Sequence, residues 1–275
     1  MNLRYLVPPV MIDAALAATR SRVGFTGYSR DFASVSTSCS GYEDEAVVAA
    51  YRANALDAAA RRRTAHPLQT QQPDSRVIRL GGAFAAACVR LGRSADLRVL
   101  DLGGAYGAQY DAVVAVAGDC IARYSIVESP AVVRGLADLA DDCLEWVDTD
   151  GSSLVDVIGA VDVAISSSTL QYLPHPETVL RELIASAPFV LLDRIPLLDH
   201  HESFVMQQHT RYGGASVTYP AWFFSRAEFH RILQAAGANI VLEWAVPEDS
   251  PFVRGRRRPN VGMLLSTPTA PTSST

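Results

Sequence analysis

From residue 97 onward, short apolar strands alternate with amphipathic helices, and this alternation constrains the fold more than any other feature. It begins with a predicted strand at 97–102 and a helix at 110–118. A strand–helix–strand repeat is typical of a parallel sheet with helices on both faces. No helix fits between the last two strands, 238–246 and 261–267, so these form a hairpin. We therefore predict a Rossmann-like α/β fold whose seven-stranded, mostly parallel sheet has a C-terminal antiparallel hairpin strand. The other strands are predicted at 124–129, 143–148, 161–168 and 189–194, and the other helices at 131–140, 176–187 and 225–237.

The first 94 residues have a different texture. Helices are predicted at 41–63, with acids in the first turn and arginines in the last, and at 76–92. A further short helix is predicted near Pro9. We interpret residues 1–94 as a helical N-terminal cap on the α/β domain.

The α/β domain is predicted to span residues 95–267, followed by a disordered tail at 268–275. Within it, residues 194–224 form a long segment with few helical signals between a strand and the next helix. Folds of this kind carry substrate loops at the carboxyl ends of strands. The aromatic stretch 219–224 of this segment is a candidate hydrophobic lid, with packing against the N-terminal helices as the alternative.

Charge and composition narrow the class of partner. The chain has 275 residues, a net charge of −5 and a pI of about 5.7, which argues against nucleic acid as a partner. No apolar run reaches the ~20 residues of a membrane span. The early apolar stretch is interrupted by Pro8, Pro9 and Asp13, so we expect no signal peptide and a cytoplasmic location.

Cysteine and histidine spacing gives no metal site. The four cysteines are scattered, as expected of free thiols in a reducing compartment: Cys39, Cys88, Cys120 and Cys143. The adjacent pair His200–His201 lacks the helical i, i+4 spacing of a metal site. We therefore predict no bound metal. The sequence leaves open whether the protein is a monomer or a homodimer.

A glycine-rich loop follows the first strand of the α/β region, in the stretch "VLDLGGAYGAQYD" at 99–111. Gly103, Gly104 and Gly107 permit a tight turn and a close approach of the backbone to a ligand. The N-terminus of the next helix supplies unpaired N–H groups for an anionic group. This much suits NAD, FAD and S-adenosylmethionine alike.

Asp101, at the mouth of that loop, separates these cofactors. A dinucleotide would lay an anionic pyrophosphate against the loop, and a carboxylate would repel it. S-adenosylmethionine presents an ammonium that Asp101 would attract, directly or through water, and a carboxylate for the loop N–H groups. The acid therefore favours S-adenosylmethionine as the cofactor, with S-adenosylhomocysteine as its product.

Acidic residues also end the second and third strands. Glu128 lies where a carboxylate suits the diol of a ribose, with a surface carboxylate as the alternative. Asp148 is a candidate contact to the edge of an adenine, and an ordinary loop acid is an equal alternative.

These motifs resemble a known family. The segments "VLDLGGAYG", "IVES" and "VDVAISSSTLQYLPHPETVLREL" are similar to those of class I S-adenosylmethionine-dependent methyltransferases. With "LLDRIP" and "ASVTYPAWFFS", the chain more specifically resembles a group of bacterial methyltransferases with little functional assignment. The resemblance implies that Asp101 and the three loop glycines hold the methionine end and that Glu128 holds the ribose. It implies methyl transfer and no particular substrate.

Residues at the ends of the fourth and fifth strands are candidates for the reaction site. Ser166 and Ser167 are small and polar, which leaves room beside the cofactor. Tyr172 either lines the site or packs in the core. Asp193, with Arg194 beside it, either pairs structurally or acts as a base or an anchor for the acceptor. His209 is a candidate base within the insertion, and the resemblance assigns it no role.

The expected function is methyl transfer to the oxygen or nitrogen of a small-molecule or carbohydrate-like acceptor. A non-catalytic module that binds S-adenosylmethionine is one alternative. An NAD-dependent oxidoreductase is another, which Asp101 and the terminal hairpin disfavour.

Overall fold

The computed structural model describes residues 23–41, 45–64, 75–212, 215–247, 250–253 and 256–268. The predicted helix near Pro9 and the tail from residue 269 onward lie outside this described part. None of the described helices is long and apolar enough to cross a membrane.

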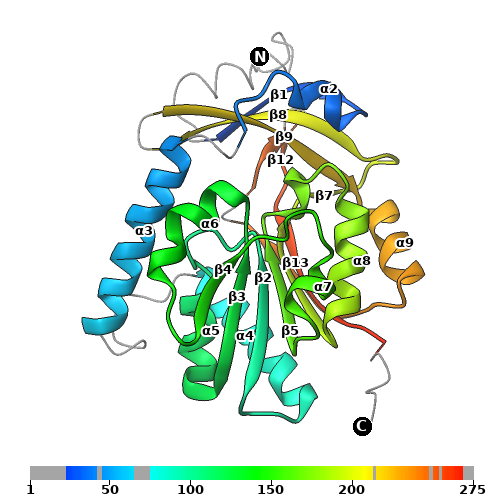
Figure 1. Cartoon of the computed structure of the whole chain (residues 1–275). Coiled ribbons are helices and arrows are strands. Elements are labelled where there is room, and N and C mark those ends of the chain that lie inside the picture. Colours follow the sequence, from blue (N-terminus) through cyan, green and yellow to red (C-terminus); the bar gives the residue numbers. More distant parts are fainter. Residues whose placement is uncertain are drawn as a thin grey trace.

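The main sheet has seven strands in the order β10-β13-β6-β5-β2-β3-β4 (Figure 1). These strands are β2 (Leu97–Leu102), β3 (Ile121–Val127), β4 (Leu144–Val147), β5 (Val163–Ser167), β6 (Phe189–Ile195), β10 (Asn239–Val246) and β13 (Asn260–Ser266). β13 is antiparallel to both of its neighbours, β10 and β6. All other neighbouring pairs in this sheet are parallel. The predicted fold class, with its antiparallel C-terminal hairpin strand, is confirmed.

Helices cover both faces of the main sheet. The described helices are α2 (Phe32–Ser36), α3 (Glu45–Thr64), α4 (Ser75–Leu91), α5 (Tyr110–Ala117), α6 (Pro130–Leu136), α7 (Leu154–Ile158), α8 (Pro176–Ser186) and α9 (Arg226–Ala235), with 3-10 turns η2 (Gly118–Cys120), η3 (Ala137–Leu139) and η4 (Leu170–Tyr172). Of these, α2 packs against strands outside the main sheet, at the top of Figure 1. One buried apolar cluster joins α4, α5 and α6 to one face, and a second joins α7, α8 and α9 to the other. Helix α7 was not predicted, because five residues with Leu154 alone fully buried carry too little helical periodicity.

The strand order places a topological switch point at the centre of the sheet. The chain leaves β2 for β3 on one side, whereas β5 lies on the other side of β2. Connections that diverge in this way leave a crevice beyond the carboxyl ends of the two central strands, where open α/β sheets bind ligands.

A second, smaller sheet lies above that edge, at the top of Figure 1. It has the order β1-β8-β9-β7, with β1 (Val23–Ser29), β7 (Leu197–Leu198), β8 (Phe204–Tyr212) and β9 (Ala215–Ser225). β1 and β8 are antiparallel, as are β8 and β9. A short hairpin, β11 (Phe252–Val253) with β12 (Arg256–Arg257), connects β10 to β13. We call the four-stranded unit the cap sheet.

The cap sheet changes two interpretations of the sequence. The segment 194–224, read as a substrate loop, contains one short and two long strands, and the N-terminal region adds a strand beside its helices. The buried apolar cluster of the cap sheet includes Phe25 from β1, Phe204 from β8 and Phe223 from β9. Because these side chains are buried only when distant segments pair, a single segment shows no clear strand pattern. Helix α4, from the N-terminal region, packs against α5 and β6 of the α/β domain. The domain boundary near residue 94 stays a prediction.

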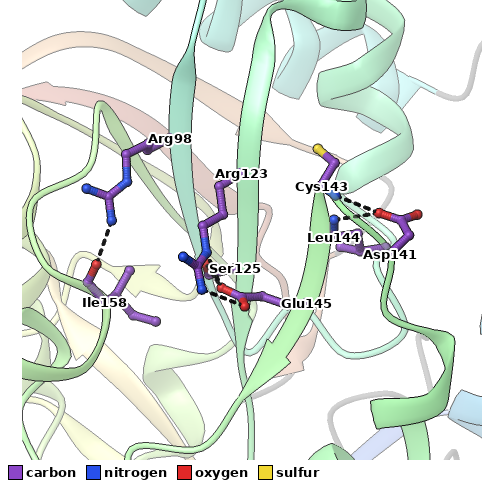
Figure 2. A network of polar contacts seen from close by, with 8 residues as sticks. All are labelled: Arg98, Arg123, Ser125, Asp141, Cys143, Leu144, Glu145 and Ile158. Atoms are coloured by element: carbon purple, nitrogen blue, oxygen red, sulfur yellow. Dashed lines mark hydrogen bonds and ion pairs between the residues drawn. The ribbon is translucent and has the colours of Figure 1, made fainter.

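Polar contacts along one edge hold the parallel strands in register (Figure 2). Arg123 on β3 donates two hydrogen bonds to Glu145 on β4, at 2.6 and 2.7 Å. Ser125 donates a third, from its Oγ to Glu145 Oε1 at 2.6 Å. The Arg123 guanidinium holds the pKa of the Glu145 carboxyl below its usual range. A slip of the register would place Glu145 on the opposite face of the sheet and break all three bonds.

The glycine pair in the middle of α4 has a packing reason. A Cβ on Gly81 would lie 2.9 Å from Val116 Cγ2 and 3.2 Å from the carbonyl oxygen of Ala112, both on α5. A Cβ on Gly82 would meet nothing within 4 Å. Gly81 therefore permits the close contact between the two helices, whereas Gly82 faces outward.

We expect Gly82→Ala to raise the free energy of unfolding by about 0.5–1 kcal/mol, because alanine is the better helix former. Gly81→Ala has the same propensity gain but must push α5 away, which costs about 1–3 kcal/mol, so it should lower stability. Urea unfolding followed by circular dichroism measures both. Equal effects of the two substitutions would contradict the packing role of Gly81.

Candidate functional site

A cavity of about 1210 Å³ lies between the carboxyl edge of the main sheet and the cap sheet. Pockets for single small ligands are usually ~300–1,000 Å³, so this one has room for two. The main-sheet side supplies Gly103, Ala105, Glu128, Ser129, Ser167, Ser168, Gln171, Tyr172 and Arg194, and the cap sheet supplies Phe25, Gln208, Thr210, Tyr219, Trp222 and Phe223. The cavity therefore lies at the topological switch point and is closed from above by β1, β8 and β9.

Along the glycine loop after β2, residues with a positive φ angle alternate with residues that have a negative one. Gly103, Ala105 and Gly107 have positive φ angles of 70°, 52° and 85°. A Cβ on Gly103 would lie 2.2 Å from Thr169 Oγ1, so this glycine lets the loop after β5 approach. Ala105, the middle one of these three residues, has a left-handed conformation that costs an L-residue about 1–2 kcal/mol.

Asp101 lies beneath this loop and does not line the cavity. Its side chain is 0% exposed, and its Oδ2 accepts a hydrogen bond from the Tyr124 hydroxyl at 2.8 Å. Its Oδ1 is buried without a hydrogen-bond partner. A Cβ on Gly104 would lie 2.4 Å from Asp101 Oδ2, so only glycine fits over the carboxyl. Burial raises the pKa of Asp101 to about 7, against the lowering effect of the Tyr124 hydrogen bond.

Glu128, at the end of β3, lines the cavity and ties two loops together. Its Oε1 accepts a hydrogen bond from the Ala105 N–H at 2.9 Å, and its Oε2 accepts one from the Ser129 N–H at 3.1 Å. Burial raises its pKa, and these two N–H groups partly offset the rise. Nearby on the cavity wall, Gln109 Oε1 and Ser129 Oγ are buried without partners. This end of the cavity therefore offers polar groups to a ligand.

The three other residues predicted to contact the cofactor are placed differently from one another. Asp148 Oδ1 accepts a hydrogen bond from the Asp150 N–H at 3.0 Å, which shapes the turn after β4. Ser166 and Ser167 are both buried on β5, and because side chains alternate along a strand they point to opposite faces. Ser167 lines the cavity, whereas Asp148 and Ser166 do not.

Asp193 points to the face of the sheet covered by α4, away from the cavity. It is 1% exposed, and its carboxyl accepts hydrogen bonds from Trp244 Nε1 at 3.2 Å and Ser167 Oγ at 3.5 Å. Burial raises its pKa, and the positive charge of Arg194 opposes the rise. The structure thus gives Asp193 structural partners, the first of the two readings that the sequence left open.

Arg194 takes the cavity position that the sequence analysis offered to Asp193. Its Nε donates to Ser167 Oγ at 3.3 Å, and its φ of 57° is rare for a residue with a Cβ. The left-handed backbone of Arg194 lies where the register between β6 and β13 shifts, so regular strand alternation does not set the direction of its side chain. Arg194 lines the cavity and Asp193 does not, although both side chains bond Ser167 Oγ. The pair was visible in the sequence, but which member faced the cavity was not.

Tyr172 and His209 are separated by the cap sheet. The Tyr172 hydroxyl donates to Gln208 Oε1 at 3.0 Å, and Gln208 Nε2 donates to the Tyr219 hydroxyl at 3.2 Å, all three on the cavity wall. His209 follows Gln208 on β8, does not line the cavity and bonds Thr26 on β1 at 2.6 Å. Burial lowers the pKa of His209. The alternation along β8 therefore brings Gln208, which the sequence analysis missed, to the site instead of His209.

No protein-family model matches the chain, and no curated protein matches it. Among solved structures, it is similar to a 1,6-didemethyltoxoflavin-N1-methyltransferase from Burkholderia thailandensis with bound S-adenosylhomocysteine: 20% identity over 80% of this chain and 88% of that one, TM-score 0.47. CalS10, an amino pentose methyltransferase from Micromonospora echinaspora with bound S-adenosylmethionine, shows 15% identity over 77% and 96%, TM-score 0.45. The [4+2]-cyclase SpnF shows 16% identity over 69% and 81%, TM-score 0.45. Likeness at this level carries no assignment, and the proposals below rest on the site.

The strained position in the glycine loop gives a stability test. We expect Ala105→Gly to raise the free energy of unfolding by about 0.5–1 kcal/mol, since relief of the left-handed conformation exceeds the entropy gained by the unfolded chain. Ala108→Gly is the matched control, because Ala108 lies in the same loop without a positive φ and should lose stability. Urea unfolding measures both, and a loss of stability in Ala105→Gly would contradict the strain.

The buried carboxyl of Asp101 gives a pH test. Its pKa is about 7 in the folded protein against an ordinary value of 3.8, so between these values the folded state holds a proton that the unfolded chain has lost. The free energy of unfolding therefore falls as pH rises through this window. Asp101→Asn cannot ionise, so at pH 8 it should be more stable than the wild type, by on the order of 2–4 kcal/mol.

Urea titrations at pH 5, 6, 7 and 8 measure this difference. Glu177→Gln, which alters an exposed carboxylate paired with Arg181 on α8, is the control and should follow the wild type. A constant offset between Asp101→Asn and the wild type across the series would contradict the raised pKa.

Proposed function

We propose that the protein transfers a methyl group from S-adenosylmethionine to the oxygen or nitrogen of a small-molecule or carbohydrate-like acceptor. One observation carries this proposal. A glycine loop with a carboxyl group buried beneath it and a second carboxylate, Glu128, beside it opens into a cavity at the topological switch point.

The residues present fit the cofactor at this end of the cavity. Glu128 retains lone pairs on both oxygens for a ribose diol, in addition to the two backbone bonds that hold it. Gln109 Oε1 and Ser129 Oγ are buried polar atoms without partners, and a nucleoside would satisfy them. The Asp101 carboxyl beneath the loop favours an ammonium over a pyrophosphate above it, with the loop backbone in between.

S-adenosylmethionine, when bound, supplies an electrophilic methyl group on a sulfonium. The chain's own residues then have to orient the acceptor and exclude water. The cap sheet does the second, since Phe25, Tyr219 and Phe223 close the cavity from above. Of the three candidate catalytic residues, Tyr172 lines the cavity, while Asp193 and His209 do not. We therefore retain Tyr172 as the candidate that would contact the acceptor.

Calorimetric titration with S-adenosylhomocysteine tests the cofactor assignment. We expect the wild type to bind it and Glu128→Gln to bind it about tenfold or more weakly, since a charged acceptor of hydrogen bonds is lost. Asp101→Asn should also weaken binding, because the charge near the ammonium disappears. Glu177→Gln, at an exposed position on α8 that does not line the cavity, should bind as the wild type does.

Two results would overturn the proposal in different ways. Affinity for NAD with none for S-adenosylhomocysteine would indicate an oxidoreductase. Binding of S-adenosylmethionine without any release of S-adenosylhomocysteine on addition of a broad acceptor panel would indicate a non-catalytic binding module.

A further inference from the structure

Two buried amide groups on the cavity wall have oxygens without hydrogen-bond donors. Gln171 is 3% exposed and Asn260 is 5% exposed, and both line the cavity. Gln171 Oε1 and Asn260 Oδ1 are buried without any partner. A buried acceptor without a donor costs about 1–3 kcal/mol, so such groups are rare unless a ligand satisfies them.

The orientation of the Gln171 amide is set by its neighbours. Its Nε2 donates to Ser168 Oγ at 2.9 Å and to the carbonyl oxygen of Arg194 at 3.3 Å. The carbonyl oxygen of Arg194 can only accept a hydrogen bond, so the amide nitrogen of Gln171 must face it. The amide oxygen of Gln171 is then the atom without a partner. Gln171 therefore presents a hydrogen-bond acceptor.

The two amides lie at one corner of the cavity, at the carboxyl end of β6. Gln171 bonds Arg194 near the end of this strand, and the next residue, Ile195, pairs with Val261 on β13. Asn260 immediately precedes Val261, so it lies beside the same strand end. We call Gln171, Arg194 and Asn260 the β6 corner. Glu128 and the glycine loop lie across β5, towards β2 and β3.

The charges around the β6 corner exclude a cationic ligand group. Arg194 belongs to this corner, and Arg257, which also lines the cavity, lies three residues before Asn260 in the sequence. The carboxylates among the described lining residues are Glu128, beside the glycine loop, and Glu182, which accepts a hydrogen bond from the Leu154 N–H at 3.0 Å. Amide oxygens beside guanidinium groups suit a hydroxyl, which is a donor without positive charge.

The wall on the cap side suits the same ligand. The Tyr172 hydroxyl donates to Gln208 Oε1, and Gln208 Nε2 donates to the Tyr219 hydroxyl. The two rings meet edge to face at 5.1 Å. This wall therefore offers aromatic surface to a sugar ring, and the β6 corner offers acceptors.

We propose that the β6 corner is the acceptor subsite and that it binds the hydroxyl groups of a sugar without positive charge, through the amide oxygens of Gln171 and Asn260. This inference rests on the proposed function, because it assigns the glycine-loop end of the cavity to the cofactor. It names the class of acceptor and the side chains that select it.

The test uses the full-length protein saturated with S-adenosylhomocysteine and three sugars that share one ring: D-glucose, D-glucuronate and D-glucosamine. Saturation-transfer NMR measures their binding. We expect D-glucose and D-glucuronate to bind and the cationic D-glucosamine to bind about tenfold more weakly. Asn260→Leu and Gln171→Met keep side-chain size and remove the amide, and each should weaken D-glucose binding about tenfold.

Gln234→Met is the matched control, since it makes the same change at an exposed position on α9 that does not line the cavity, and it should leave D-glucose binding to the saturated protein unchanged. Asn260→Leu should also raise the free energy of unfolding without ligand, because it removes a buried unpaired oxygen. If Gln171→Met fails to fold, Asn260→Leu alone decides.

The outcomes separate the two proposals. Failure of the wild type to bind S-adenosylhomocysteine would overturn the proposed function. Binding of S-adenosylhomocysteine without binding of D-glucose or D-glucuronate would overturn the subsite alone. So would equal binding of D-glucosamine, or unchanged D-glucose binding in both amide variants.

Discussion

The buried carboxyl of Asp101 is the constraint on which the site depends. It lies beneath the glycine loop, where Tyr124 donates to one oxygen and Gly104 passes directly over the same oxygen. Any side chain at position 104 would collide with it, and the loop would have to rise into the cavity. With the loop held down, the Ala105 N–H reaches Glu128 and the Gly103 N–H reaches the carbonyl oxygen of Val127 at 2.8 Å. The shape of the glycine-loop end of the cavity, the proposed cofactor site, thus depends on one buried acid.

The direction in which strand side chains turn decides which polar residues reach the cavity. At the end of β6 the left-handed backbone of Arg194 interrupts the regular strand, and Arg194 lines the cavity while Asp193 faces α4. On β8 the regular alternation of side chains turns Gln208 inward and His209 towards β1. On each strand the neighbour of the expected residue lines the cavity. A guanidinium and an amide therefore stand where an acid and a base were expected. The side chains at the proposed acceptor end therefore suit hydrogen bonding and orientation of a ligand more than proton transfer.

The cap sheet covers the crevice at the switch point from above and makes it a deep cavity. Its strands come from distant parts of the sequence, since β1 precedes the main sheet and β7, β8 and β9 lie between β6 and β10. The Gly41 N–H also bonds the Thr218 carbonyl at 3.0 Å, which ties the N-terminal region to β9. Closure from above is what a reaction that must exclude water requires. The position of the cap also explains why so many aromatic residues gather in one short stretch of β9.

The amino-acid sequence by itself determined the seven-stranded sheet, its antiparallel hairpin strand and the place of the glycine loop. These depend on local patterns: apolar strands, helical periodicity and glycines at a strand end. It also singled out Asp101 and Glu128, because each ends a strand beside that loop. Only the tertiary structure decided that the insertion pairs with β1 to form a second sheet, and that Gln171, Arg194, Gln208 and Asn260 meet in one cavity. The physical reason is that strand pairing between distant segments, and the face to which a side chain turns, depend on neighbours that no local pattern identifies.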